Sequence, residues 1–313
     1  MKIGNATVIS FINLKGGVGK TTSAVNVAAT LAKRELEPKS SSDKNRKKQA
    51  SVLLIDLDPQ SNASLTLLNK EQYLEIDKNN KTLYQLFEHE ILRDDDSDTF
   101  NLNSIRVTPI DGLKLDLLPS SLKLIDIQDK LVGYHRYYLS ATDILFNALH
   151  KLNDPQGRAY THIIVDCPPS LGLITLNALS LSRYFIVPTF LDAYSYWGLD
   201  KIVERVERLK KCKASCEDEL LGVLYSKVDP KATLENRKWD KEFRDWEANN
   251  IRKNKGSVIF KSYIKSADII RKAEANNRPL IEYDPSDSNL KKQQETHQLE
   301  WENLVTEILE RIK

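Results

Sequence analysis

A glycine-rich segment near the N-terminus has the residue types and spacing of a phosphate-binding loop. Residues 15–22 read Lys-Gly-Gly-Val-Gly-Lys-Thr-Thr. Glycine allows a backbone to approach an anion closely and to point its N–H groups at it. In such a loop Lys20 can reach the β- and γ-phosphates of a nucleotide, and the Thr21 hydroxyl can bind magnesium. The segment predicts ATP and Mg²⁺ as cofactors, with these cofactor-binding residues: Lys15, Gly16, Gly17, Val18, Gly19, Lys20, Thr21 and Thr22.

Three acidic residues follow apolar runs at positions that suit a bound metal ion. The run from Val52 continues to Asp56, and Asp58 stands two residues later, before Pro59. Another apolar run ends at Asp166. Packing at the end of a buried strand does not require a charged side chain, so an acid there suggests a functional role. Carboxylate oxygens are ligands that magnesium prefers. Asp58 could instead only form a turn before Pro59, so both interpretations stay open.

These residues need elements that bring them together. Short apolar, β-branched runs alternate with helical patterns, the first of which predicts a helix at Thr22–Lys33. This alternation predicts an α/β fold with a mostly parallel twisted sheet and helices on both faces, as in P-loop NTPases. Ligands of such sheets bind at the carboxyl ends of the strands, where the glycine loop and the acids lie. The expected strands are Thr7–Ile12, Val52–Leu57, Leu113–Leu118, His162–Val165, Tyr184–Val187, Leu221–Leu224 and Ser257–Phe260.

We expect residues 1–313 to form a single P-loop domain with two elaborations. Residues 35–50 contain a proline, three consecutive serines and several basic residues, which predicts a mobile basic loop. Residues 231–256 are polar and rich in both charges. Within them Trp239, Phe243 and Trp246 recur at helical spacing, which favours a helix packed on the body over a platform for stacking bases.

Composition excludes several classes of protein. With 41% hydrophobic residues the chain can bury a core, and a net charge of +2 does not by itself indicate nucleic acid or a membrane. Three cysteines are too few for a disulfide framework, and Cys212 and Cys216 are interpreted as reduced thiols. No apolar stretch approaches the roughly 20 residues of a membrane span, so a soluble cytoplasmic protein is expected.

The glycine loop departs from the usual pattern G-x-x-x-x-G-K-[ST], because Leu14 occupies the first glycine position and Lys15 follows it. In this respect it resembles the deviant loop of the ParA/MinD family, K-G-G-x-G-K-[ST]-[ST]. The resemblance implies that Lys15 reaches across a dimer interface to the partner's phosphates, as a cation supplied in trans. Taken in isolation, Lys15 would be interpreted as a solvated loop lysine.

The acids also match motifs of this family. Residues 56–60, Asp-Leu-Asp-Pro-Gln, resemble its first switch, which implies that Asp56 supports the magnesium shell and Asp58 positions the attacking water. Asp166 resembles its Walker B acid, and residues 168–172, Pro-Pro-Ser-Leu-Gly, resemble its second switch. The implied catalytic residues are Lys15, Lys20 and Asp58, and the implied magnesium residues are Thr21, Asp56 and Asp166.

Other segments extend the resemblance from about residue 7 to residue 285. Residues 115–121, Leu-Asp-Leu-Leu-Pro-Ser-Ser, match a segment of the family, and so does Ile186-Val-Pro-Thr with the later Gly198-Leu199. The stretch from Ile264 to Leu280 resembles its C-terminal motif, although Lys265 stands where the family usually has proline.

Within the family, the chain most resembles ParA-type partition and cargo-positioning ATPases. This implies slow hydrolysis of ATP to ADP and phosphate, a homodimer with ATP, non-specific DNA binding, a ParB-like or cargo-adaptor partner that stimulates hydrolysis, and nucleoid association in the cytoplasm. Residues 227–278 contain 14 Lys and Arg against 8 Asp and Glu, whereas the whole chain is only +2. A solvated charged face is the alternative interpretation of this segment. The candidate DNA-binding residues are Lys261, Lys265, Arg271 and Lys272.

Two other branches of the superfamily are alternatives. A MinD-like, membrane-associated ATPase would need a basic amphipathic helix at the end of the chain. Residues 299–313 are amphipathic but carry four glutamates against Arg311 and Lys313, so we expect a helix packed on the body and no membrane partner. A metabolic P-loop enzyme is disfavoured by Lys15 and the Asp-Pro-Gln segment, and an iron–sulfur reductase by the placement of the cysteines.

Overall fold

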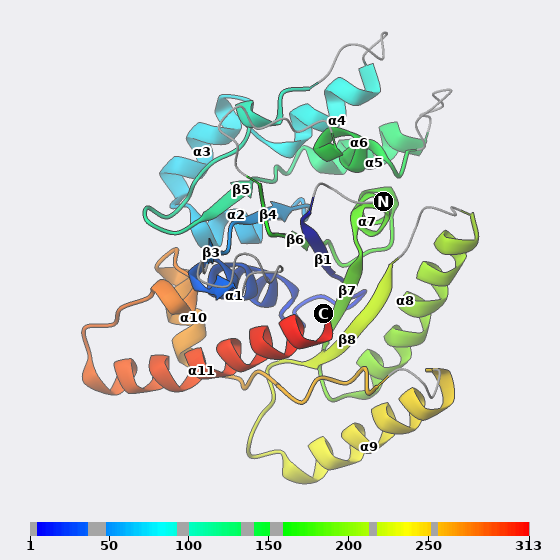
Figure 1. The fold of residues 1–313 in the computed structure, drawn as a ribbon, viewed down its shortest axis with the longest axis vertical. Helices are drawn as coiled ribbons and strands as arrows, with labels where there is room; N and C mark the ends of the chain where they lie inside the picture. The colour runs from blue at the N-terminus through cyan, green and yellow to red at the C-terminus, as the bar shows by residue number, and fades with distance from the viewer. Residues whose placement is uncertain are drawn as a thin grey trace, which may run out of the picture.

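A parallel sheet runs through the computed structural model of the chain (Figure 1). The structure describes residues 5–36, 48–92, 100–132, 141–150, 159–212, 218–251 and 256–312. Among them, six strands form this sheet in the order β5-β4-β6-β1-β7-β8. In chain order the strands are β1 Thr7–Phe11, β4 Val52–Asp56, β5 Leu115–Leu118, β6 His162–Asp166, β7 Tyr184–Thr189 and β8 Glu219–Tyr225.

Helices cover both faces of the sheet (Figure 1). One face carries α1 (Lys20–Lys33), α2 (Asn62–Leu67), α10 (Asp268–Ala275) and α11 (Ser288–Arg311). The other carries α4 (Leu83–Leu92), α5 (Leu124–Val132), α6 (Ile144–His150), α7 (Leu173–Leu181), α8 (Ala193–Cys212) and α9 (Thr233–Asn250). The remaining described helices are α3 (Lys70–Lys78) and the 3-10 turns Leu102–Ser104 and Leu280–Glu282.

Alternation of side chains along each strand divides the core in two. In β4, Leu54 packs with the α1 side of the sheet, whereas Leu53 and Ile55 pack with the opposite side. Because both faces are covered, every residue of β4 is buried and the strand is apolar up to Asp56. This arrangement confirms the predicted α/β fold with helices on both faces.

The strand order brings the chemical motifs to adjacent positions. Strand β6 lies between β1 and β4, so Asp166 is in register with Phe11 on one side and with Asp56 on the other. The glycine loop begins at Lys15, four residues after Phe11. Since all these strands are parallel, the glycine loop and the acids meet at the same carboxyl edge of the sheet.

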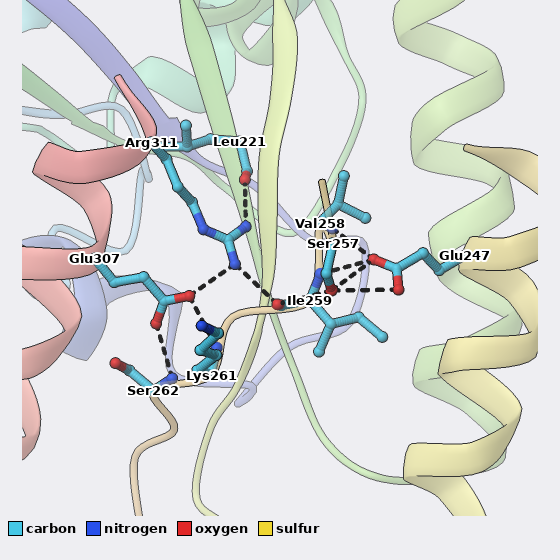
Figure 2. Close-up of polar contacts among 9 residues, drawn as sticks. All are labelled: Leu221, Glu247, Ser257, Val258, Ile259, Lys261, Ser262, Glu307 and Arg311. Atoms are coloured by element: carbon cyan, nitrogen blue, oxygen red, sulfur yellow. Dashed lines mark hydrogen bonds and ion pairs between the residues drawn. The ribbon is translucent and has the colours of Figure 1, made fainter. Parts of the chain in front are cut away.

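The prediction of a strand at Ser257–Phe260 is wrong. Ile259 forms only an isolated bridge with Val223 of β8. The reason is visible in Figure 2, where Glu247 of α9 accepts hydrogen bonds from the backbone N–H groups of Val258 and Ile259. A backbone N–H group that bonds to a side chain cannot also bond to a neighbouring strand. The segment therefore runs beside β8 without forming a seventh strand of the sheet.

The C-terminal helix holds the same segment from its other side (Figure 2). Glu307 accepts from the backbone N–H groups of Lys261 and Ser262, both at 2.9 Å. Arg311 donates to the carbonyl of Ile259 at 2.8 Å and pairs with Glu307 at 2.7 Å. Charged side chains of two helices therefore hold the segment, in addition to its two backbone bonds with β8.

The two elaborations are described only in part. The ends of the predicted basic loop, β2 (Glu35–Leu36) and β3 (Lys48–Gln49), form a short antiparallel pair, and residues 37–47 lie outside the described residues. The second elaboration contains α9, where Phe243 and Trp246 are buried, and residues 252–255 lie outside the described part. The prediction that these aromatic residues pack the helix onto the body is confirmed.

The predicted C-terminal helix is also confirmed. Helix α11 packs on α1 and buries four apolar side chains in the core on that face of the sheet. These side chains are Trp301, Leu304, Val305 and Ile308. Among the described helices, none is long and apolar enough to cross a lipid bilayer.

Candidate functional site

The glycine loop links β1 to α1 at the carboxyl edge of the sheet. Gly17 and Gly19 have φ angles of 76° and 80°, in the left-handed region that residues with a Cβ rarely adopt. Val18 between them is fully buried and anchors the loop on the body. The local sequence therefore dictates a tight loop that ends at the first turn of a helix.

The loop presents a run of free backbone donors. Among the described residues, no hydrogen bond uses the backbone N–H of any residue from Gly16 to Thr22 as its donor. The N-cap residue Gly19 has no side chain to satisfy the first turn of α1. Successive free N–H groups at a helix N-terminus form an anion-binding concavity, and the helix dipole adds positive potential there.

Lys20 lies inside this concavity. Its side chain is buried, and its ammonium donates to the carbonyl of Lys15 at 3.1 Å. Burial lowers the pKa of Lys20, and the charges of Asp166 and Asp58 oppose that shift. A cation held by one backbone carbonyl and facing two carboxylates is placed to neutralise an anionic ligand.

Asp166 is the acid whose carboxylate oxygens are left to coordinate a cation. It is fully buried, and neither carboxylate oxygen has a hydrogen-bond partner within normal geometry among the described residues. Burial and the nearby charge of Asp56 raise the pKa of Asp166 well above its ordinary value, whereas the Thr21 hydroxyl and Lys20 favour its ionised form. A buried carboxylate without donors is stabilised by a cation, so Asp166 and Thr21 fit a magnesium site.

The set of protein ligands also agrees with magnesium. Among the described residues, no group of three or more His, Cys, Asp and Glu is arranged to hold a metal ion by itself. Magnesium is commonly bound by one or two protein oxygens, with water and substrate phosphates completing its octahedron. The residues present therefore fit a metal that binds together with a nucleotide.

Asp56 already has protein partners for both oxygens. Its Oδ2 accepts from the backbone N–H and the hydroxyl of Ser64, at 2.8 and 2.7 Å. Its Oδ1 accepts from the backbone N–H of Asp58 at 3.2 Å. Burial raises the pKa of Asp56 to about 7, and the bonds from Ser64 oppose that shift. In this structure Asp56 fixes the loop before α2, and its predicted place in the magnesium shell stays a prediction.

Asp58 forms the turn that was one of its two interpretations, and its predicted role in positioning water stays a prediction. Its Oδ1 accepts from the backbone N–H of Gln60 at 3.0 Å, which is the expected turn at Pro59. Its backbone carbonyl accepts from the hydroxyl of Ser120 at 2.6 Å, so the loop is also tied to the segment after β5. The turn leaves the carboxylate among the charges of the site, where it acts electrostatically on Lys20.

Lys15 does not point into the glycine loop. Its ammonium pairs with Asp192 at 2.5 Å and lies over the rings of Phe190 and Tyr194, 4.9 and 5.7 Å from their centroids. Asp192 also caps α8 by accepting from the backbone N–H of Ser195 at 2.8 Å. Although burial would raise the pKa of Asp192, the bonds from Lys15 and Ser195 lower it. Lys15 is thus held against its own chain in this structure.

Several residues at the site carry no motif in the sequence. Ser226 and Lys227, at the end of β8, bond to carbonyls of the glycine loop. Glu274 of α10 accepts from the hydroxyl of Thr22 at 2.6 Å, so that hydroxyl is engaged away from the loop. The order Asp192-Ala-Tyr-Ser is an N-cap pattern that the sequence could have shown, but its contact with Lys15 has no local signal.

The four candidate DNA-binding residues differ in how exposed their side chains are and in whether an acid already pairs with them. Lys261, Arg271 and Lys272 are exposed. Arg271 pairs with Asp268 on the same helix, and both side chains are largely in solvent. Lys265 is tied to Glu300 by its backbone N–H at 3.1 Å and its ammonium at 3.3 Å. Lys261 and Lys272 are therefore the freer cations.

Comparison with known proteins finds a matching family model and a similar relative. A family model described as an AAA domain matches residues 6–218. The sporulation initiation inhibitor protein Soj of Bacillus subtilis is 29% identical over 284 residues, covering 89% of this chain and 91% of Soj.

Two solved structures share the fold. One is a protein of Borrelia burgdorferi B31, described as a plasmid partition protein bound to AMPPNP, with 20% identity, a TM-score of 0.68 and coverage of 98% of this chain and 99% of that one. The other is cobyrinic acid a,c-diamide synthase of Mycobacterium smegmatis with ADP and magnesium, with 22% identity, a TM-score of 0.62 and coverage of 88% and 92%.

Proposed function

The chain belongs to the ParA/MinD-type family of P-loop ATPases, whose ParA-like members act in partition and positioning, and we propose that it hydrolyses ATP with magnesium to position a DNA or protein cargo. One observation carries the nucleotide part of this proposal. Within the described part of the chain, the N–H groups from Gly16 to Thr22 are unpartnered, Lys20 is buried in the same loop, and the Asp166 oxygens have no partner within normal geometry. AMPPNP in one structure of similar fold, and ADP and magnesium in the other, support the same ligands.

In the proposed reaction each residue has a separate task. The loop N–H groups and Lys20 bind the β- and γ-phosphates, and Thr21 and Asp166 hold magnesium, directly or through water. Bound magnesium would neutralise charge that develops on the phosphate oxygens. Asp58 orients the attacking water, because its turn is fixed by Gln60 and Ser120 while its charge remains in the site. The products are ADP and phosphate.

We also propose that two copies meet at the carboxyl edge of the sheet when ATP is bound. Five large apolar residues are exposed near the N-terminal ends of helices that follow β5, β7 and β8. Exposed apolar side chains gathered on one edge favour an interface. Lys15 contacts one of these side chains and is placed to cross to the partner's phosphates once it leaves Asp192. The five residues are Leu122, Ile125, Tyr194, Trp197 and Leu234.

The DNA part of the proposal rests on the charge of residues 227–278 and on the exposed Lys261, Arg271 and Lys272. Contacts from such residues to phosphates are independent of sequence and weaken with salt. A ParB-like or cargo-adaptor protein would stimulate hydrolysis, and the protein would associate with the nucleoid in the cytoplasm. We treat residues 1–313 as one domain, because both core clusters flank the same sheet.

A gel-shift series tests the DNA part against its alternatives. The dimer with ATP should bind two unrelated duplexes equally, and the ADP form should bind weakly. With about six phosphates contacted, log affinity should fall against log salt with a slope near −5. Lys261→Ala and Lys272→Ala should weaken binding more than Lys265→Ala, whose ammonium is paired with Glu300.

Parallel assays separate the other branches of the family. Vesicles with anionic lipid should not bind the ATP form, and binding to them but not to DNA would favour a MinD-like role. ATP hydrolysis without binding to DNA or vesicles would favour a metabolic enzyme, the kind of protein to which the Mycobacterium smegmatis structure belongs.

A further inference from the structure

Two residues at the end of β8 hold consecutive carbonyl groups of the glycine loop. The hydroxyl of Ser226 donates to the carbonyl of Val18 at 2.6 Å. The ammonium of Lys227 donates to the carbonyl of Gly17 at 2.9 Å. Ser226 is buried, and the loop approaches it so closely that a Cβ on Gly19 would lie 3.6 Å from its side chain.

These bonds determine where the neighbouring N–H groups point. In a trans peptide unit the carbonyl of one residue and the N–H of the next point in opposite directions. A carbonyl of Gly17 held by Lys227 therefore turns the N–H of Val18 away from β8. A carbonyl of Val18 held by Ser226 does the same for the N–H of Gly19. Both N–H groups belong to the unpartnered run described above.

The backbone of Lys227 is itself in a conformation that lysine rarely adopts. Its φ is 51°, and two of the other three non-glycine residues with positive φ in the described chain are asparagines, Asn80 and Asn277. Hydrogen bonds on both sides fix this geometry, from the N–H of Ser226 to Thr189 and from the N–H of Val228 to Ile264. Strained residues of this kind persist where the surrounding structure requires them, often at binding sites.

We propose that Ser226 and Lys227 are positioning residues that orient the peptide groups of the glycine loop for polyphosphate binding. They would act through the loop backbone and not by contact with the nucleobase. The inference rests on the nucleotide binding proposed above, and it is independent of the dimer and of DNA.

Lys227→Asn separates positioning from a structural role. Asparagine tolerates the left-handed backbone better than lysine, so the melting temperature without ligand should stay the same or rise. Because the bond to Gly17 is lost, affinity for a fluorescent ATP analogue should fall about tenfold. Lys227→Arg keeps a donor and should recover most of the affinity. Ser226→Ala removes the bond to Val18 and should lower the affinity for the analogue by a similar factor.

Lys114→Asn is the matched control, because Lys114 is an exposed lysine before β5 and the substitution changes the charge equally. It should bind the analogue as the wild type does. Inorganic tripolyphosphate, which has no base, should displace the analogue less well from Lys227→Asn than from the control.

The outcomes are distinct. Absence of analogue binding by the wild type would refute the proposed function itself. Equal affinity of wild type and Lys227→Asn overturns this inference and leaves nucleotide binding intact. If Lys227→Asn lowers both the melting temperature and the affinity for the analogue, Lys227 has a purely structural role and the inference is overturned. Normal competition by tripolyphosphate, together with weaker ATP binding, overturns it in favour of contact with the base.

Discussion

At the scale of single residues, the three acids of the site are distinguished by their partners. Among the described residues, Asp166 has no hydrogen bond within normal geometry, and the Thr21 hydroxyl is a nearby donor. Asp56 accepts three hydrogen bonds, and the Asp58 carboxylate accepts one from the turn that it begins. The acid without such a bond is the one suited to a cation, and the acid with three donors is suited to fixing a loop. Asp58, between these extremes, can hold its turn and still act on a water.

The first prediction concerns Asp58. Asp58→Asn keeps an oxygen that can accept from Gln60, so the turn should persist and ATP should bind normally. Loss of the charge that orients water should lower turnover by about 100-fold or more. Single-turnover hydrolysis and analogue binding measure the two effects. Asp126→Asn, at an exposed site on α5, is the control, and normal turnover in Asp58→Asn would show that the water-positioning role is misassigned.

The second prediction concerns Asp56 and pH. Its pKa is raised to about 7 from an ordinary 3.8, because it is fully buried. Between these values the folded state holds a proton that the unfolded state has released, so this group makes the free energy of unfolding fall as pH rises from about 4 to about 7. The asparagine of the Asp56→Asn variant cannot titrate. The free energy of unfolding of this variant should therefore lack a fall of about 2 to 4 kcal/mol that the wild type shows over this pH range.

Urea titrations at several pH values between about 4 and 8 measure this difference. The free energy of unfolding of Asp126→Asn should follow the wild type across the series. Parallel curves for the wild type and Asp56→Asn would mean that Asp56 is ionised in the folded protein throughout this range.

At the scale of elements, charged side chains take over a task that strands perform elsewhere. Glu247 of α9 and Glu307 of α11 bind the backbone of residues 257–262 from two sides (Figure 2). Bonds from backbone N–H groups to Glu307 help to lower its pKa, against the effect of burial. The segment that carries Lys261 is thus positioned by the C-terminal helix.

The third prediction tests this attachment. Glu307→Ala removes the acceptor of two backbone N–H groups and the charged partner of Arg311. It should lower the free energy of unfolding by about 1 to 2 kcal/mol, since the Glu307 side chain is only 13% exposed. Under the proposed function it should also weaken DNA binding, because Lys261 loses its fixed position. Glu310→Ala is the control for both measurements, because Glu310 is exposed and lies three residues after Glu307 on α11. Unchanged stability of Glu307→Ala would contradict the assignment.

At the scale of the whole molecule, the carboxyl edge of the sheet combines the site with exposed apolar side chains. Lys15 lies at this edge but is paired in cis with Asp192. An ATP dimer of the proposed kind requires that this ion pair break in each copy. Exposed ion pairs contribute only about 0.2 to 1 kcal/mol, so the pair can delay dimer formation without preventing it.

The fourth prediction follows from that competition. Asp192→Asn keeps the oxygen that caps α8 and removes the charge that holds Lys15. Because two such pairs are released, the ATP dimer should form at a protein concentration about 2- to 30-fold lower. Lys15→Ala should bind ATP and remain monomeric. Light scattering with ATP and with ADP measures these states, and a Lys15→Ala dimer equal to the wild type would remove the trans role.

The parts of this protein that depend on near neighbours in the chain can be predicted from its amino-acid order. The glycine loop, the strands that end at Asp56 and Asp166, and the buried aromatic residues of α9 are all set by spacing within a few residues. Periodicity and glycine content act locally, so the elements and the loop could be predicted. The one predicted strand that does not form, Ser257–Phe260, is apolar enough, but the N–H groups of Val258 and Ile259 bond to Glu247 instead.

Only the tertiary structure decided which distant residues meet. The contacts of Lys15 with Asp192, of Ser226 with Val18 and of Thr22 with Glu274 span 177, 208 and 252 positions in the chain. The strand order, with β6 between β1 and β4 and with β7 and β8 on the other side of β1, creates such contacts. No local pattern encodes that order, because strand pairing is settled by the packing of both faces of the whole sheet.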